Sequence, residues 1–543
     1  MGAAGAPPVA NSFAVAAEPN STPAAPKFVL TPEADISTIV EAARARYNTG
    51  VTRSLSWRKN QLRALFRMFD ENESVFLEAS HKDMAKHHNE TWAYDVLILK
   101  NEIVDALENL DSWSKPERVD PGLPNMLDTA EIRRDPFGLC LVIGAWNYPY
   151  QLTLGPMMAA IAAGNAVIVK PSEVASHAAA AMAHFLPKYL DPVLFPVVNG
   201  GVPETTALLK IRFDHIFYTG NGFVGKIVAA AAAKNLTPCV LELGGKSPVI
   251  IDETADLAIA AKRVMWAKSI NCGQTCVAPD YVLVPRGKVD AFAAACKDAV
   301  LDLYGENPKT NSHYPRVITK RQFDRLTDVL DKQKAIGTTK VAVGGETDAS
   351  DLYIAPTVLT GVSGSDPVME DEIFGPLLPI LPTDSVNECI DFVRAREKPL
   401  ALYVFSKNQK VVDDVLARTD SGNAVVNDLL MNMTIPNLPF GGVGASGSGK
   451  YHGKAGFDTY THTRSYLQCP AGMDLVTMPR YPKMAYSNGG RKLLSALLEK
   501  RVGGFWALMR KLALPTRTWA YVFCIVVGFV IGGGAQNRWT WWR

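Results

Sequence analysis

The chain has little net charge for its length and lacks the cysteine pattern of a disulfide-stabilised protein. Among its 543 residues, 56 Lys and Arg stand against 54 Asp and Glu, which gives a formal net charge of +2. Its eight cysteines have no regular spacing, and the N-terminus shows no secretory signal pattern, so we expect free thiols in a reducing compartment. The nine histidines are dispersed. Cys272 and Cys276 have the spacing Cys-x-x-x-Cys, but no second cysteine pair follows at zinc spacing, so we expect no metal.

The small net charge hides an uneven distribution along the chain. From Pro470 to Arg543, 11 Lys and Arg stand against 2 Asp and Glu. The net charge of this segment is therefore +9. Because the whole chain has a net charge of +2, the residues before it have a net charge of −7. A mildly acidic body does not favour nucleic acid as a partner, and we expect none.

The first part of the chain changes character near residue 26. Residues 1–26 are rich in Ala and Pro and have no apolar periodicity, which predicts a disordered arm. From Asp35 to about Ser114, apolar residues recur at helical spacing, as at Leu62, Leu65, Phe66 and Phe69, so this block predicts helices.

Short runs that are apolar throughout begin after Glu131 and alternate with Ala-rich segments of helical length. Such runs are typical of strands buried on both faces of a parallel sheet. They continue beyond Cys276, so we expect an α/β protein with two such domains. The runs are GLCLVIGAW, NAVIVKP, HIFYTG, PCVLELGG and SPVII, followed by YVLVP, KVAVGG, APTVL, LPILP and ALYVFS.

A glycine-rich loop with the spacing G-x-G-x-x-G follows the run HIFYTG. Gly220, Gly222 and Gly225 stand between a strand-like run and a helix-like one, the context in which this spacing indicates dinucleotide binding. A tight strand-to-helix turn is the alternative. The acidic residue that would hold a ribose stays open: spacing favours Glu242, and Glu173 and Glu372 compete with it.

The stretch GQTCVAPD contains Cys276 without a charge until its last residue. A lone cysteine is usually a small buried side chain, and only an activated thiolate acts as a nucleophile. The residues alone leave both interpretations open, and Cys272 is the alternative nucleophile.

Six motifs in order make the chain resemble the aldehyde dehydrogenase superfamily from about residue 35 to 468. Its YHGK stretch and apolar C-terminal tail resemble the class 3 branch and the membrane-anchored fatty aldehyde dehydrogenases within it. The resemblance implies two Rossmann-like parallel-sheet domains in a homodimer. The motifs are GAWNYP, AGNAVIVKPSE, LELGGKSP, GQTCVAPD, EIFGP and PFGGVGASGSGKYHGK.

Composition, periodicity and the resemblance together divide the chain into six segments. They are a disordered arm (1–26), an NAD-binding domain (27–242), a catalytic domain (243–438), a return segment with a dimerisation strand (439–470), amphipathic gate or linker helices (471–517) and a transmembrane anchor (518–537).

Roles for individual residues follow from the same resemblance. Cys276 would attack the aldehyde, Asn147 would stabilise the oxyanion, and Glu242 would activate the hydrolytic water. NAD is expected, because Glu173 would repel a 2′-phosphate, while NADP is possible. The residues implied to contact the cofactor are Trp146, Lys170, Glu173, Gly220, Gly222, Gly225, Glu372 and Phe374.

The C-terminus contains 20 uncharged residues between Arg517 and Arg538. A helix of this length would span about 30 Å, which is one hydrocarbon core. We expect it to anchor a cytosolic catalytic body in membrane lipid; a buried helix or a dimer contact is the alternative. The endoplasmic reticulum is favoured, with the mitochondrial outer membrane, peroxisome and lipid droplet open. Before it, GGRKLLSALLEKR (489–501) has one apolar stripe, typical of a helix that packs on the body, lies on a membrane or gates the substrate mouth.

The resulting functional hypothesis is oxidation of long-chain aliphatic aldehydes to acids with NAD or NADP. The alternatives are a semialdehyde dehydrogenase for a small polar substrate and a non-catalytic membrane-bound scaffold. A scaffold would be indicated by loss of Cys276, Glu242 or Asn147, and all three are present.

Overall fold

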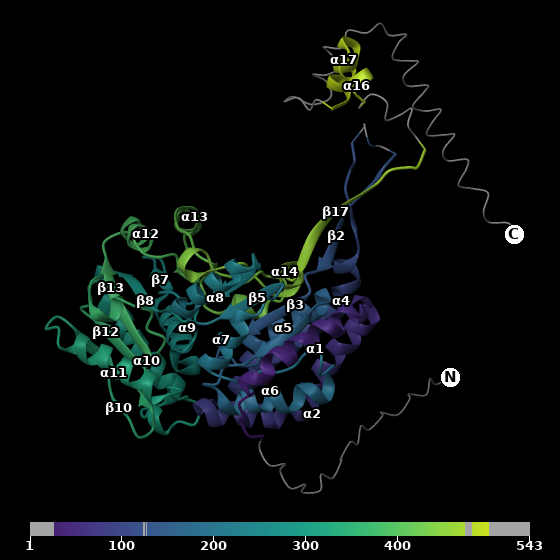
Figure 1. Cartoon of the computed structure of the whole chain (residues 1–543). Helices are drawn as coiled ribbons and strands as arrows, with labels where there is room; N and C mark the ends of the chain where they lie inside the picture. Colours follow the sequence, from purple (N-terminus) through teal and green to yellow (C-terminus); the bar gives the residue numbers. More distant parts are fainter. Residues whose placement is uncertain (1–25, 123–124, 126, 473–480, 499–543) are drawn as a thin grey trace, which may run out of the picture. The chain divides into compact units, whose positions relative to one another are not determined.

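The computed structural model of the protein describes residues 26–122, 125, 127–472 and 481–498 (Figure 1). Most of the expected N-terminal arm and the whole expected anchor at 518–537 lie outside this range. The described residues fall into two compact units: unit 1 lies within Met1–Lys115 and Arg134–Thr463, and unit 2 within Pro116–Arg133 and Arg464–Arg543.

Unit 1 begins with helices, as the spacing of apolar residues between Asp35 and Ser114 predicts. Ser54 starts the longest helix by accepting a hydrogen bond from the N–H of Trp57. Its buried face includes Leu62, Leu65 and Phe69, which are fully buried. The helices are α1 (Ile36–Asn48), α2 (Leu55–Met84), α3 (His88–Thr91) and α4 (Leu97–Ser114), with a π-helical turn (Trp92–Val96) before α4.

The first sheet of unit 1 has five strands in the order β16-β6-β5-β3-β4. The last four are parallel, and the short β16 is antiparallel to β6 at the edge. Every residue of β3, β4 and β5 is buried, which explains why these runs are apolar throughout. The strands are β16 (Gly447–Ser448), β6 (Cys239–Glu242), β5 (His215–Thr219), β3 (Leu139–Ile143) and β4 (Ala166–Lys170).

The second sheet of unit 1 has seven strands in the order β15-β14-β7-β8-β13-β12-β9. All neighbours are parallel except β9, which is antiparallel to β12. The strands are β15 (Asn423–Val426), β14 (Ala401–Phe405), β7 (Pro248–Ile251), β8 (Tyr281–Pro285), β13 (Leu377–Thr383), β12 (Thr357–Thr360) and β9 (Lys340–Val343); β10 (Thr347–Asp348) and β11 (Tyr353–Ile354) form a separate hairpin.

The ten apolar runs quoted from the sequence all contain strands of these two sheets, so the predicted α/β class with parallel sheets is confirmed. Helices follow the strands: α5 packs on β3 and β4, α8 on β5 and β6, and α10 beside the second sheet against α9 (Figure 1). The helices are α5 (Gln151–Ala163), α6 (Ser176–Tyr189), α7 (Val202–Lys210), α8 (Gly222–Lys234), α9 (Leu257–Ser269), α10 (Val289–Tyr304), α11 (Lys320–Lys334), α12 (Val386–Arg394), α13 (Gln409–Arg418) and α14 (Gly453–Thr459).

A three-stranded sheet in the order β1-β2-β17 involves unit 2. Within this unit the guanidinium of Arg133 lies 3.7 Å from the ring centroid of Tyr466. The strands are β1 (Glu117–Arg118), β2 (Thr129–Pro136) and β17 (Thr461–Gln468), and the helices of the unit are α16 (Pro482–Ala485) and α17 (Asn488–Leu498). Helix α17 confirms the helix predicted from 489 as far as the description extends. No helix in the described part of the chain is both long and apolar enough to cross a membrane.

Candidate active site

The carboxyl ends of four parallel strands bring most of the predicted site residues to one edge of the first sheet. Ile143 of β3 is level with Lys170 of β4 and with Tyr218 of β5, and Thr219 of β5 is level with Glu242 of β6. Ligands of open α/β sheets bind outside these ends. The predicted residues placed at or just after them are Trp146, Asn147, Lys170, Glu173, Gly220, Gly222, Gly225 and Glu242.

The glycine loop after β5 leads directly into α8. The side chain of Asn221 accepts a hydrogen bond from the N–H of Val224, and Gly222 is the first helical residue. A Cβ on Gly222 would meet no atom within 4 Å, whereas one on Gly225 would lie 2.8 Å from Leu243. The backbone is therefore open to a phosphate at the start of the helix and tightly packed one turn later. These residues fit a dinucleotide pyrophosphate.

Lys170 and Glu173 form an ion pair at the end of β4. The Nζ of Lys170 donates to Oε2 of Glu173 at 2.8 Å. The lysine side chain is 5% exposed, while that of Glu173 is 39% exposed, so the carboxylate has one face open to a ligand. Such a carboxylate can accept hydrogen bonds from ribose hydroxyls.

The turn of residues 270–276, which we call the nucleophile turn after the role expected of Cys276, precedes β8. Asn271 and Cys272 both adopt left-handed backbone conformations, with φ of 52° and 55°. Cys272 is fully buried, and its Sγ lies 3.7 Å from the hydroxyl of Tyr314. Cys276 is partly exposed. Access therefore favours Cys276 over Cys272 as the nucleophile.

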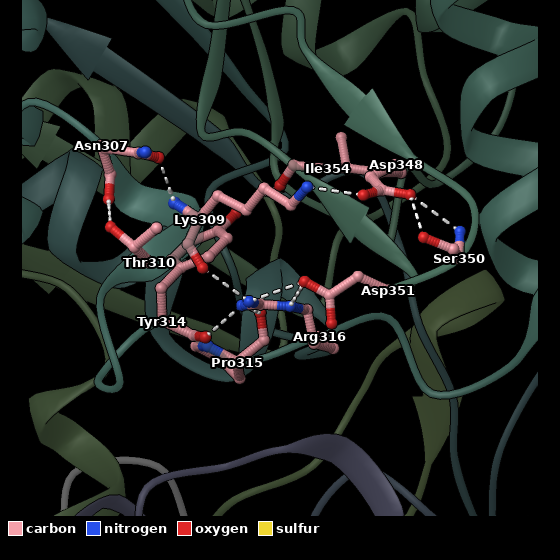
Figure 2. Close-up of polar contacts among 10 residues, drawn as sticks. All are labelled: Asn307, Lys309, Thr310, Tyr314, Pro315, Arg316, Asp348, Ser350, Asp351 and Ile354. Atoms are coloured by element: carbon pink, nitrogen blue, oxygen red, sulfur yellow. Dashed lines mark hydrogen bonds and ion pairs between the residues drawn. The ribbon is translucent and has the colours of Figure 1, made fainter.

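Gln274 ties the nucleophile turn to the segment that precedes α11. Its Nε2 donates to the carbonyl oxygens of Asn271 (2.9 Å) and Arg316 (3.0 Å), and its Oε1 accepts from the N–H of Ile318 (3.0 Å). Figure 2 shows how that segment is itself fixed: the guanidinium of Arg316 binds Asp351 and the carbonyl oxygens of Lys309 and Tyr314. The turn is thus hydrogen-bonded to a segment that Arg316 itself holds in place.

Asn147 lies in the loop between β3 and α5 and is 3% exposed. Its Nδ2 donates to the carbonyl oxygen of Gln274 at 3.1 Å, and the hydroxyl of the next residue, Tyr148, lies 2.9 Å from that of Thr275. The loop is therefore fastened to the nucleophile turn at two adjacent positions. This places the carboxamide against the turn that holds Cys276, a position compatible with stabilising an oxyanion.

Glu242 and Cys276 lie in a desolvated environment that favours their neutral forms. Glu242 is 3% exposed, neither carboxyl oxygen has a hydrogen-bond partner among the described residues, and burial raises its pKa well above the ordinary value. Burial also raises the pKa of the Cys276 thiol, and the charges of Glu372 and Glu242 raise it further. A change in the charge of either carboxyl therefore alters the ionisation of the thiol.

Glu372 and Phe374 belong to the loop before β13. Burial raises the pKa of Glu372 to about 8, and its carboxyl fills the space where Gly244 would carry a Cβ. Phe374 has a left-handed backbone, and its ring meets that of Trp146 edge-on with centroids 5.4 Å apart. Two predicted cofactor-binding side chains, from loops next to different sheets, are thus in contact.

Several residues near the site were not predicted from the sequence. Tyr451 is buried beside Glu242, whose charge adds to burial in raising its pKa, and its hydroxyl has no partner in the described part of the chain. His452 Nδ1 lies 2.8 Å from Glu102, and both are at most 2% exposed. Lys86 is fully buried and bonds to Asn147. The YHGK stretch was a signal for Tyr451 and His452; Lys86, in the charged stretch HKDMAKHHNE, has none.

A small hollow open to solvent adjoins the nucleophile turn. Its wall is mostly aromatic and aliphatic, and it includes Thr275, the neighbour of Cys276. The hollow therefore presents an apolar wall next to the turn that holds Cys276. The lining residues are Tyr94, Ile98, Tyr148, Gln151, Trp266, Ile270, Thr275, Leu430, Met431, Met433 and Thr434.

Comparison with known proteins identifies relatives over most of the chain. The model of the Aldehyde dehydrogenase family matches residues 16–466. Rat "Aldehyde dehydrogenase family 3 member A2" is 48% identical over 443 residues, covering 82% of this chain and 90% of the relative. Rat "Aldehyde dehydrogenase, dimeric NADP-preferring" is 47% identical over 447 residues, covering 82% and 97%.

Solved structures agree with these matches. The substrate-bound state of Staphylococcus aureus AldH has a TM-score of 0.79 and 39% identity, covering 81% of this chain and 95% of the other. Mycobacterium tuberculosis aldehyde dehydrogenase complexed with NAD+ has a TM-score of 0.73 and 26% identity, covering 82% and 92%. Enzymes of this kind oxidise aldehydes with NAD or NADP. The chain therefore belongs to the aldehyde dehydrogenase family, in its class 3 branch.

Proposed function

We propose that the protein oxidises long-chain aliphatic aldehydes to carboxylic acids, with Cys276 as nucleophile. The observation that carries the proposal is the apolar hollow beside Thr275, which adjoins the turn that holds a partly exposed cysteine. An alkyl chain gains about 0.8 kcal/mol for each CH₂ group that it buries, so such a wall favours long aliphatic substrates. A polar semialdehyde would leave its second polar group unpaired there.

The first half of the reaction forms a bond between sulfur and the aldehyde carbon. The thiolate of Cys276 attacks the carbonyl, and the oxygen gains a negative charge that the Asn147 carboxamide and the Cys276 N–H stabilise. When bound, the nicotinamide dinucleotide supplies the acceptor for the hydride that leaves this carbon. A thioester with Cys276 remains.

The second half hydrolyses the thioester. Glu242, as the carboxylate, takes a proton from water, the hydroxide attacks the thioester carbon, and the sulfur of Cys276 leaves as thiolate. The product is the carboxylic acid. A general base works best with a pKa near the working pH, and burial moves the Glu242 pKa upward from an ordinary carboxyl value.

The cofactor in this proposal is NAD, held at the carboxyl ends of the first sheet. Lys170 and Glu173 bind the adenine ribose, the loop from Gly220 to Gly225 binds the pyrophosphate, and Glu372 binds the nicotinamide ribose. The Glu173 carboxylate disfavours a 2′-phosphate, so NADP is the weaker cofactor.

The experiment that tests the proposal is an aldehyde panel on the full-length protein in detergent. We expect hexadecanal to have a kcat/KM at least about tenfold above that of a short polar semialdehyde, from burial of its extra CH₂ groups. A preference for the semialdehyde would contradict the long-chain proposal, and no turnover of any aldehyde would support the scaffold alternative.

A polar substitution in the hollow should act on long substrates alone. Met433 lines the hollow and is partly buried, and glutamine has nearly its length. We expect Met433→Gln to lower kcat/KM for hexadecanal about tenfold, because an unpaired amide faces the alkyl chain, and to leave acetaldehyde within about twofold. Leu438→Gln is the matched control, since Leu438 is 45% exposed in the same segment and outside the lining. Equal effects on both substrates would contradict the proposal that the alkyl chain binds in the hollow.

We also propose that residues 518–537 anchor the enzyme in a membrane, which supports access to aldehydes that partition into lipid. The support is the 20-residue uncharged stretch with aromatic residues near both ends. We expect the full-length protein to resist carbonate extraction and a chain ending at Pro515 to be released. Release of the full-length protein would contradict the anchor.

Other proposed roles follow the same division of the chain. We assign NAD binding to 27–242, catalysis to 243–438, dimerisation to 439–470, and a linker or substrate gate to 471–517. Endoplasmic reticulum membrane is the favoured location, with the catalytic body in the cytosol because Arg510, Lys511 and Arg517 precede the anchor.

A further inference from the structure

Lys86 is a fully buried lysine that none of the six family-like motifs contains. Helix α2 ends at Met84, and Ala85, with φ of 49°, turns the chain inward. The Nζ of Lys86 donates to the carbonyl oxygen of Asn147 at 3.0 Å and lies 4.4 Å from the ring centroid of Tyr148. A charged group outside the motifs therefore contacts the loop that carries the oxyanion-binding residue.

Burying this ammonium is costly, and neighbouring carboxylates offset part of the cost. Burial lowers the pKa of Lys86, while the charges of Glu90, Asp95 and Asp83 raise it. Each of these carboxylates also holds another part of the site region. Glu90 accepts the N–H of Asn271 at 2.8 Å, Asp95 the N–H of Gln151 at 2.6 Å, and Asp83 two N–H groups at the start of α6.

The carbonyl oxygen of Asn147 receives a second hydrogen bond, from Nδ2 of Asn271 at 2.9 Å. We call these two donors, Lys86 Nζ and Asn271 Nδ2, the Asn147 clamp. The carboxamide of Asn147 is fixed at its other end by the carbonyl oxygen of Gln274. The clamp fixes the peptide plane that follows Asn147, and the Gln274 contact fixes its side chain.

Only a narrow range of positions lets a carboxamide stabilise an oxyanion, since misplacement by about 1 Å can cost 100-fold in rate. We propose that Lys86 and Asn271 are positioning residues, which act on the reaction by holding Asn147 in the geometry for oxyanion binding. The inference rests on the proposed function, in which Asn147 stabilises the oxyanion.

The test compares the pre-steady-state burst of reduced cofactor in full-length variants. Lys86→Met keeps the length of the side chain and removes the donor. Asn271→Gly removes the other donor, and glycine accepts the left-handed backbone at this position. We expect each to lower the burst rate about 100-fold, as a misplaced group would. Lys82→Met, at an exposed lysine of α2 paired with Glu78, should leave the rate within about twofold.

Two further readouts separate positioning from a general loss of structure. The dissociation constant of NAD and the rate at which iodoacetamide alkylates Cys276, followed by peptide mapping, should stay within about twofold of wild type, since neither depends on Asn147. In an Asn147→Ala background, Lys86→Met and Asn271→Gly should each cost less than about threefold, because a clamp has nothing left to position.

Wild-type burst rates in both variants would overturn the inference, as would losses that persist in full in the Asn147→Ala background. If Lys86→Met does not fold, Asn271→Gly alone decides between these outcomes. A wild-type burst in Asn147→Ala itself would refute the proposed role of Asn147 and the clamp together. An impaired Asn147→Ala with unimpaired clamp variants would refute only the clamp.

Discussion

Cys276→Ser should abolish aldehyde oxidation, with kcat at least about 10⁴-fold below wild type, as is usual when a catalytic nucleophile is removed. The serine hydroxyl ionises far less readily than a thiol. NAD binding should stay within about twofold of wild type, because the residues expected to bind the cofactor lie in other segments of the chain. Steady-state turnover and a fluorescence titration with NAD measure the two quantities.

Cys272→Ser is the control for this prediction. Cys272 is buried against the hydroxyl of Tyr314, four residues before the nucleophile. A serine there can keep that hydrogen bond, so activity should stay within about threefold of wild type. Retention of more than a few per cent of the rate in Cys276→Ser, or loss of it in Cys272→Ser, would move the nucleophile to Cys272.

Glu242→Gln should separate the two halves of the reaction. The variant should give a burst of NADH of one equivalent per enzyme subunit and then fall at least about 100-fold in rate, because the thioester forms but no base activates water. Rapid-mixing absorbance at 340 nm measures the burst, and mass spectrometry of the quenched protein detects the acyl group on Cys276. Loss of the burst in a folded variant would assign Glu242 to the cofactor or to the thiol.

The pH dependence of this variant has a definite sign. Burial raises the pKa of the Cys276 thiol, and the negative charges of Glu372 and Glu242 add to this effect. Glutamine removes one of these charges, so the thiolate forms at lower pH. The midpoint of the rate of iodoacetamide alkylation of Cys276 should therefore shift to lower pH in Glu242→Gln, and a shift to higher pH would contradict the proposed proximity.

Parallel strands buried on both faces were predictable from the sequence because their residues are apolar without interruption, as in β3 and β4. Strands β2 and β17 were harder to detect: β2 is mainly half-buried and β17 mostly exposed, and their polar composition gives no periodic signal. The antiparallel direction of β9 and the pairing of β16 with β6 depend on contacts between distant residues, which no local pattern encodes.

The site was predictable only where a motif carried it. By spacing, Glu242 qualified as the ribose-binding carboxylate, because the rule counts residues and does not see that β6 ends beside the nucleophile turn. Lys86 was not predictable, since a lysine in a charged stretch predicts an exposed side chain. Its burial depends on the turn at Ala85 and on carboxylates from α3 and the following π-helical turn, which meet only in three dimensions.

The edge pairing of β16 with β6 has a consequence for biosynthesis. Gly447 pairs with Glu242, so the strand that ends in this carboxylate remains an open sheet edge until residues about 200 positions later have left the ribosome. Until β16 has been synthesised, the nascent chain can aggregate through the unpaired edge of β6. A premature stop codon between positions 277 and 447 would therefore produce a protein that contains Cys276, Glu242 and Asn147 and still exposes the unpaired edge of β6. Such a protein would be a substrate for chaperones and proteases.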